Sequence, residues 1–270
     1  MRIEGKYVYA GGIKTHYFEE GSGEPLILLH SGEYGGCAET SWEYNIDYLS
    51  QYFKVYAPDW LGYGKTEKLF DFTDMRNKRK EHIKEFMKTL NIESAYFIGN
   101  SMGASMLLEV AAETNPRWNI KKLIAISGGE NAPENAARAI LSQYDGSMGH
   151  YKKILQVCFY DEKWHSGPFL EKRYEASLEP GSWECTAAAR FKAPFAPKRS
   201  RELTDYSQIK IPTLIVGGKQ DPLKDVDYGI KLTDKIPNSY LEMFDNCSHC
   251  AHIEHHEQFN RLAVSFLLDR

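Results

Sequence analysis

A serine between two glycines is the strongest chemical signal in the sequence. The segment GNSMG, residues 99–103, follows an apolar run and precedes an apolar helical pattern. The pattern G-x-S-x-G between a strand and a helix is typical of a nucleophilic serine on a strained turn. The glycines let neighbouring backbone approach closely, and the helix start presents free N–H groups to developing negative charge. Taken alone, the pattern also fits a serine N-cap on an ordinary strand-to-helix turn.

A nucleophilic serine needs a base, and the base needs an orienting carboxylate. Asp221 follows the apolar run 212–218, and His249 follows the run 240–244. Hydrolases with a parallel sheet carry these groups in the order Ser, Asp, His, at the carboxyl ends of strands. We therefore predict that Ser101, Asp221 and His249 form a catalytic triad.

Neighbouring residues offer alternatives for the acid and the base. Asp225 and Asp227 compete with Asp221, but they fall inside the helical pattern 224–236. The alternatives to His249 as the base are His252, His255 and His256, which follow it closely in "CSHCAHIEHH". We favour His249 because it comes directly after the last expected strand.

The elements expected around these residues alternate between strands and helices. Apolar runs without alternation predict buried strands at 25–30, 54–58, 95–99, 122–127, 212–218 and 240–244. Helical patterns lie between and after them at 76–90, 102–115, 224–236 and 256–268. This alternation predicts an α/β fold with a mostly parallel sheet covered by helices on both faces. Residues 7–25 alternate around a Gly-Gly turn, which predicts an antiparallel hairpin at one sheet edge.

Residues 130–205 interrupt the alternation of strands and helices. They are rich in aromatic residues, helical in pattern, and broken by Pro and Gly in "LEPGSW" and "FKAPFAPK". A loop of this length without structure is uncommon in a compact domain. We therefore predict a helical cap at 130–205, inserted into a core made of residues 1–129 and 206–270.

Composition narrows the range of partners. The 270 residues are 42% hydrophobic with a net charge of −4, which favours a globular protein without nucleic-acid or anionic-membrane partners. No apolar stretch approaches the ~20 residues of a membrane span, and the N-terminus lacks the apolar region of a signal peptide. Five cysteines without framework spacing favour reduced thiols and a cytoplasmic location. The composition is compatible with a homo-oligomer.

Several segments together resemble the α/β-hydrolase family over nearly the whole chain. They are "LLHSGEYGG", "APDWLGYGKT", "GNSMGA", "GGKQDP" and "CSHCAHIEHHEQFN". More narrowly, "LGYGKT", "GNSMG", "KRYEAS" and "SHCAHIEH" resemble the meta-cleavage-product hydrolases. The resemblance implies an α/β-hydrolase fold without a cofactor, and a small-molecule substrate. It also implies cleavage of a carbon–carbon bond in ring-opened dienoic acids from aromatic degradation, after ketonisation of the dienol.

The resemblance also assigns roles by position. It implies that Asn100 contacts the substrate and that Arg173 holds the substrate carboxylate. The N–H of Met102 would be one oxyanion donor, and the loop near Gly32 would supply the other. Without the resemblance, an ion pair of Arg173 within its own cap helix would be preferred, with Glu171 or Glu175 as the partner.

Three positions depart from the family pattern. Glu33 stands where a run of glycines is usual, Ser41 where an Asn usually precedes the loop Trp, and Cys250 where a Trp usually follows the catalytic His. A carboxylate beside an oxyanion hole would oppose the developing charge unless Glu33 points away or is protonated. We expect these three residues to shape which substrates bind.

Other motifs in the sequence give weaker support to functions other than hydrolysis. "GYGKT" is not a phosphate-binding loop, because that motif requires glycine at the position of Asp59. A single C-x-x-C in 247–256 is a weak metal signal, so we expect no metal site. A carboxylesterase or lactonase would use the same triad, and a small-ligand binding protein with little turnover would use the same fold. A metal-binding module is a third alternative.

Overall fold

The computed structural model describes residues 3–129, 133–191 and 204–270. The strands are β1 (Lys6–Ala10), β2 (Ile13–Glu20), β3 (Pro25–Leu29), β4 (Lys54–Pro58), β5 (Ala95–Asn100), β6 (Ile120–Ile126), β7 (Thr213–Gly218) and β8 (Ser239–Phe244). The helices of the core are α1 (Ala38–Trp42), α2 (Ile46–Leu49), α3 (Met75–Thr89), α4 (Met102–Ala111), α9 (Tyr228–Lys235), α10 (Ala251–Glu254) and α11 (His256–Leu268). Between β6 and β7 lie α5 (Ala136–Ser142), α6 (Met148–Cys158), α7 (Gly167–Ser177) and α8 (Ser182–Ala187).

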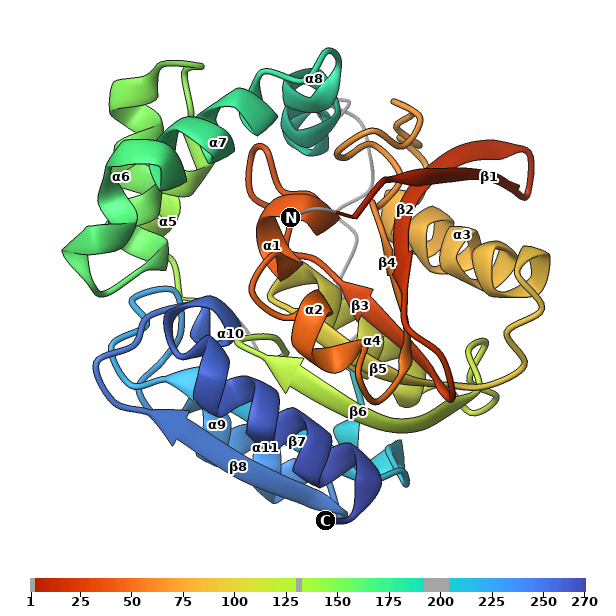
Figure 1. Cartoon of the computed structure of the whole chain (residues 1–270). Coiled ribbons are helices and arrows are strands. Elements are labelled where there is room, and N and C mark those ends of the chain that lie inside the picture. Colours follow the sequence, from red (N-terminus) through yellow and green to blue (C-terminus); the bar gives the residue numbers. More distant parts are fainter. Residues whose placement is uncertain (1–2, 130–132, 192–203) are drawn as a thin grey trace.

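One sheet of eight strands forms the centre of the fold, in the order β1-β2-β4-β3-β5-β6-β7-β8 (Figure 1). Strands β3 to β8 pair in parallel, because helices connect them. The β1–β2 hairpin adds to this sheet in antiparallel pairing at one edge, as the sequence predicted. All six apolar runs are strands.

Helices cover both faces of the sheet, and each face has its own apolar core. Buried side chains of α3, α4 and α9 pack on one face. Buried side chains of α1, α2 and α11 pack on the other. This two-sided burial explains why the strands read as continuous apolar runs rather than as alternating ones.

Two helices are shorter than their patterns predicted. The pattern 102–115 ends as α4 at Ala111, ahead of Pro116, which disfavours helical backbone before it. The pattern 224–236 becomes helical only from Tyr228, so α9 starts four residues later than predicted. Helices α1 and α2 were missed, because four or five residues are too few to show a helical period.

Helices α5 to α8 form a group beside the carboxyl end of the sheet (Figure 1). They lie within residues 130–205, the segment that the sequence analysis assigned to a cap. Their aromatic side chains form a third apolar cluster, which includes Tyr34, Leu223, Cys250 and Ile253 from the core. These helices therefore cover the loops in which the predicted catalytic residues lie. Within the described residues, no helix combines the length and apolar character that crossing a bilayer requires.

Candidate active site

Ser101 occupies a strained turn between β5 and α4. Its backbone has φ 53° and ψ −109°, in the left-handed half of conformational space that non-glycine residues rarely adopt. A side chain at Gly99 would lie 2.6 Å from the backbone nitrogen of Ala104, and one at Gly103 would collide with the carbonyl oxygen of Leu29. The two glycines thus make room for the bend that holds Ser101 at the start of the helix.

His249 and Asp221 form a buried pair at the carboxyl end of the sheet. The Nδ1 atom of His249 lies 2.7 Å from Oδ2 of Asp221, and both side chains are buried. Oδ1 of Asp221 accepts a hydrogen bond from the N–H of Leu223 at 2.9 Å. Burial alone would raise the pKa of Asp221, but His249 and the hydrogen bonds outweigh it and hold that pKa below its ordinary value. Asp221 is therefore ionised at neutral pH and can orient the imidazole.

The rival aspartates contact other groups. The reason given for excluding them was wrong, because Asp225 lies before α9 and Asp227 is its N-cap rather than inside it. Asp225 is exposed, and Asp227 pairs with Lys231 at 2.8 Å. Of the three aspartates, Asp221 is the one that contacts His249.

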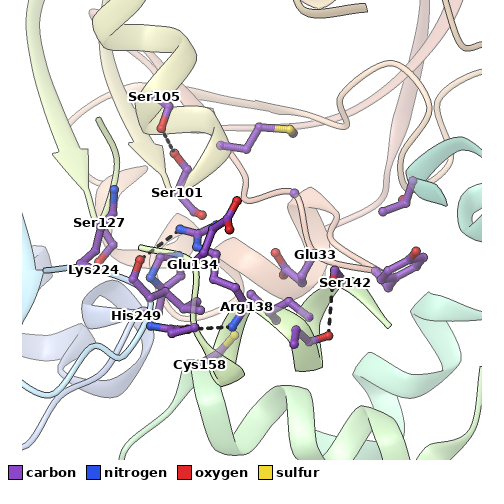
Figure 2. Close-up of a pocket in the computed structure, with 18 of the residues that line it drawn as sticks. Glu33, Ser101, Ser105, Ser127, Glu134, Arg138, Ser142, Cys158, Lys224 and His249 are labelled. Carbon is purple, nitrogen blue, oxygen red and sulfur yellow. Dashed lines mark hydrogen bonds between the residues drawn. The ribbon is translucent and has the colours of Figure 1, made fainter. Parts of the chain in front are cut away.

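Ser101 and His249 line one cavity of about 650 Å³, whose lining also includes residues of α5, α6 and α8. Figure 2 shows Ser101 at the start of α4, with His249, Arg138 and Glu33 around the same space. No direct hydrogen bond joins the Ser101 hydroxyl to His249 in the part of the chain that the structure describes. Such contacts are often long without a substrate and shorten in the reacting complex.

The loop after β3 lies beside the serine. The N–H of Trp60 donates to Nε2 of His30 at 3.0 Å, so Nδ1 carries the proton and donates to the Ser31 carbonyl at 2.6 Å. A side chain at Gly32 would lie 2.8 Å from Sδ of Met102. The two predicted oxyanion donors therefore belong to adjacent segments, and both line the cavity that contains Ser101. The first N–H groups of α4 have no partner within the helix.

A small recess opens at the inner end of the cavity, and His249, Glu33 and Cys158 line both spaces. Its open volume is about 20 Å³, so it can admit a small polar group but not a ring. The predicted substrate-binding residues meet here, since its lining includes Glu33, Ser41, Asn100, Arg173 and Cys250. They come from five different segments of the chain.

Arg173 is fixed at this recess by contacts on three sides. Its Nη2 donates to the carbonyl of Thr40 at 2.6 Å and pairs with Oε1 of Glu43 at 2.9 Å. Its guanidinium lies 3.4 Å from the ring centroid of Phe169. The alternative of a partner within its own helix is wrong, because the acid that Arg173 contacts is Glu43, just after α1.

Several polar atoms around this recess have no hydrogen-bond partner among the described residues. They are Nη1 of Arg173, Oδ1 of Asn100, and both ring nitrogens of His252. Buried polar atoms are nearly always paired, because leaving one unpaired costs about 1–3 kcal/mol. The recess therefore has the character of a site that a polar ligand completes.

Sequence reasoning missed some residues of the site. His252 follows His249 by only three positions, at the point where the loop after β8 enters α10, and this nearness in sequence could have indicated a shared site. Arg138 and Lys224 lie near Asp221; Arg138 donates to the Leu223 carbonyl at 3.0 Å. Nothing in the sequence connects Arg138 with Asp221, because the two residues come together only when α5 packs beside the loop that follows β7.

The cysteines and histidines of segment 247–256 lie in different surroundings. Cys247 and Cys250 are buried, and burial raises the pKa of each thiol well above its ordinary value. His255 contacts the carbonyl of Asn246 at 3.2 Å, and His256 packs on Tyr44. No group of three or more His, Cys, Asp or Glu that could hold a metal occurs in the described ranges.

Known proteins resemble this chain along most of its length. The profile of the alpha/beta hydrolase fold family matches residues 25–256. The 2-hydroxymuconate semialdehyde hydrolase of Pseudomonas sp. (strain CF600) is 29% identical over 273 residues, which cover 98% of this chain and 94% of that protein. The 2-hydroxy-6-oxo-6-(2'-aminophenyl)hexa-2,4-dienoic acid hydrolase of Metapseudomonas resinovorans is 29% identical over 266 residues, covering 98% and 91%.

Solved structures show the same likeness in three dimensions. The meta-cleavage product hydrolase CumD of Pseudomonas fluorescens IP01, a serine-to-alanine mutant complexed with acetates, superposes with a TM-score of 0.88. It is 26% identical, and the superposition covers 99% of this chain and 98% of that one.

Proposed function

Because the chain belongs to the alpha/beta hydrolase fold family, we propose that it is a serine-dependent hydrolase that cleaves a carbon–carbon bond in ring-opened, carboxylated dienones. Ser101 is the nucleophile, His249 the base and Asp221 the orienting acid. The N–H groups of Met102 and Gly32 receive the oxyanion, and the substrate is a small molecule.

The inner recess is the observation that carries the choice of substrate. It is small and polar and adjoins His249, and Arg173 there has a buried N–H without a partner. A carboxylate fits this donor, since guanidinium and carboxylate pair through charge-assisted hydrogen bonds. The larger cavity of about 650 Å³ then holds the rest of the molecule, so that the scissile bond lies near Ser101 and His249. The names of the related enzymes describe substrates of this kind.

The chemistry follows from these positions. The dienol first becomes a 2-oxo compound as its hydroxyl proton moves to carbon 5. Ser101, or water activated by His249, then attacks the carbonyl carbon at position 6, and the proton of the nucleophile passes to His249. The oxyanion receives hydrogen bonds from Met102 and Gly32. The carbon–carbon bond breaks with its electron pair on the dienoate fragment, which takes the proton back from His249. If Ser101 is the nucleophile, water then releases the acyl group.

A substrate panel tests the proposal directly. Purified protein is assayed with 2-hydroxy-6-oxo-dienoates that differ in the 6-substituent, and with p-nitrophenyl esters of neutral acids. We expect kcat/KM for at least one dienoate to exceed that for every ester. Ester hydrolysis without dienoate cleavage would indicate a carboxylesterase or lactonase, and tight binding without turnover would indicate a binding protein.

Arg173→Ala and Arg173→Lys should lower kcat/KM for dienoates by about tenfold to a hundredfold, the ~1.5–3 kcal/mol of a hydrogen bond to a charged group. Neutral esters should lose much less, because they have no carboxylate at the recess. Lysine lacks the planar guanidinium with its parallel N–H donors, so Arg173→Lys should not restore kcat/KM for dienoates. Lys172→Ala is the matched control, since Lys172 also pairs with Glu43, at 2.8 Å, but does not line the recess. Equal losses on both substrate types would contradict the carboxylate contact.

Glu33→Gln should leave the triad working and lower KM for dienoates by about twofold to tenfold, the effect of removing one nearby like charge. The Glu33 carboxylate lines the same recess as Arg173, where Glu43 already balances the guanidinium. Neutral esters should change little. Steady-state kinetics at two salt concentrations would separate this charge effect from damage to the site. Complete loss of turnover would instead require a direct catalytic role for Glu33.

The proposed location is the cytoplasm. All five cysteines are free and buried, which suits a compartment that keeps thiols reduced.

A further inference from the structure

We propose that His252 binds the oxygen on the carbon next to the substrate carboxylate, so that the inner recess recognises a 2-hydroxy or 2-oxo acid. This inference rests on the proposed function, because it assigns one end of that substrate to a particular side chain. It adds a substrate-binding residue that the sequence analysis did not select.

The first observation is that His252 is fully buried without a hydrogen-bond partner for its ring. Its exposed fraction is 0%, and neither ring nitrogen is paired in the part of the chain that the structure describes. The ring centroid lies 4.7 Å from that of Trp42 and 6.2 Å from that of Phe259. An apolar ring would pack against these aromatics without the cost of unpaired nitrogens. Packing alone therefore does not explain a histidine here.

The second observation is its position at the recess. His252 lines this space together with Arg173, Asn100 and His249. Its backbone carbonyl accepts a hydrogen bond from Asn45 at 2.8 Å, which fixes the short helix α10 on which the ring stands. The ring is thus held at the wall of a site that already contains a carboxylate-binding candidate.

The protonation state of the ring suits a neutral oxygen. Burial, followed by the nearby charges of His249 and Arg173, lowers the pKa of His252 to about 3. The backbone of Ser41 acts in the opposite direction and raises this pKa, but its effect is smaller. At neutral pH the imidazole is therefore uncharged, with one N–H donor and one acceptor nitrogen.

The unpaired atoms of the recess match a 2-hydroxy acid. Nη1 of Arg173 is a donor for a carboxylate oxygen, and Oδ1 of Asn100 is an acceptor for a hydroxyl hydrogen. His252 can donate to a 2-oxo group or accept from a 2-hydroxyl group. A dienol that becomes a ketone presents first a donor and then an acceptor at this oxygen, and a neutral imidazole can bind either form.

The first experiment compares His252→Phe with His252→Gln on a dienoate and on a neutral p-nitrophenyl ester. Phenylalanine keeps the ring packing and removes both polar atoms, whereas glutamine keeps a donor and an acceptor. We expect His252→Phe to lower kcat/KM for the dienoate by about tenfold to a hundredfold, as the loss of buried hydrogen bonds predicts. Ester hydrolysis should fall by a smaller factor than dienoate cleavage, and His252→Gln should retain most dienoate activity. The control is His255→Phe, since His255 lies outside the recess.

The second experiment measures inhibition of ester hydrolysis by 2-oxopentanoate and by pentanoate, which lacks the 2-oxygen. In the wild type the 2-oxo acid should inhibit about tenfold more strongly, the value of one buried hydrogen bond. The ratio of the inhibition constant of pentanoate to that of 2-oxopentanoate should stay at this value in His252→Gln and in His255→Phe. It should fall to about one in His252→Phe. Because it needs no dienoate, the ratio tests His252 even if the protein does not cleave carbon–carbon bonds. If His252→Phe does not fold, a ratio near one in the folded wild type overturns the inference.

The outcomes separate the two proposals. A wild-type ratio above one that His252→Phe removes supports the inference, whatever happens to dienoates. If folded His252→Phe cleaves dienoates with unchanged kinetics and shows an unchanged inhibition ratio, the inference about His252 is overturned. The proposed function is then left intact. Equal losses on dienoate and ester, with a lowered melting temperature, would assign His252 a structural role and also overturn it.

Discussion

Ser101→Ala should remove nearly all turnover, by several orders of magnitude, and leave the fold intact. The hydroxyl is the only group of Ser101 that can attack a carbonyl, and alanine has no replacement for it. The change deletes one oxygen and keeps the Cβ atom, so the turn and the close backbone approaches that Gly99 and Gly103 permit should be unchanged. Single-turnover and steady-state assays on the best substrate measure the loss of turnover. Circular dichroism of the variant tests whether the fold is intact.

Ser142→Ala is the matched control. Ser142 lines the same cavity from α5, and its hydroxyl bonds only the Ala139 carbonyl, at 3.1 Å, in the described part of the chain. The control should retain turnover near that of the wild type. Ser101→Ala with near-wild-type turnover on every substrate would contradict the serine-dependent mechanism. Residual turnover of carbon–carbon bonds alone, with ester hydrolysis abolished, would indicate attack by water instead of serine.

Much of the core fold could be predicted because its strands are buried on both faces. Continuous apolar runs marked β3 to β8, and the glycine-rich break after β5 marked the turn at Ser101. The family match confirms the predicted α/β-hydrolase fold, and the relatives confirm the resemblance to meta-cleavage product hydrolases. Strand order along the chain also brought Asp221 and His249 to the same edge of the sheet, where they contact each other.

The contacts of the recess could not be predicted, because they join segments that are distant in sequence. Arg173 pairs with Glu43, 130 positions earlier, next to a helix too short to have a periodic pattern. The sequence alone favoured an acid two positions away on the same helix, Glu171 or Glu175, although side chains at that spacing do not face each other. The start of α9 was also misplaced, because Asp225 and Asp227 lie in a turn whose polar and apolar spacing imitates a helix. Both the partner of Arg173 and the start of α9 are therefore set by tertiary packing rather than by local sequence.

Asp221→Asn should lower kcat by about 10⁴-fold, because an amide no longer holds the imidazole in the tautomer that accepts a proton from serine. Asp221 accepts from Nδ1 of His249 at 2.7 Å, whereas an asparagine amide at that position can donate to Nδ1 and move the ring proton to Nε2. The volume and shape of the side chain are unchanged. Asp225→Asn is the control on the same loop, since Asp225 is exposed and does not contact His249.

The same variant has a pH signature in stability. The folded-state pKa of Asp221 lies below its ordinary value of about 3.9, so its ionised form stabilises the fold above that pH. This contribution is lost as pH falls through the folded-state pKa, and Asp221→Asn lacks it at every pH. The difference in melting temperature between wild type and variant should therefore change as pH falls from about 5 to 3, where Asp221 becomes protonated. A pH-independent difference, with kcat reduced by less than about tenfold, would mean that Asp221 does not act through His249.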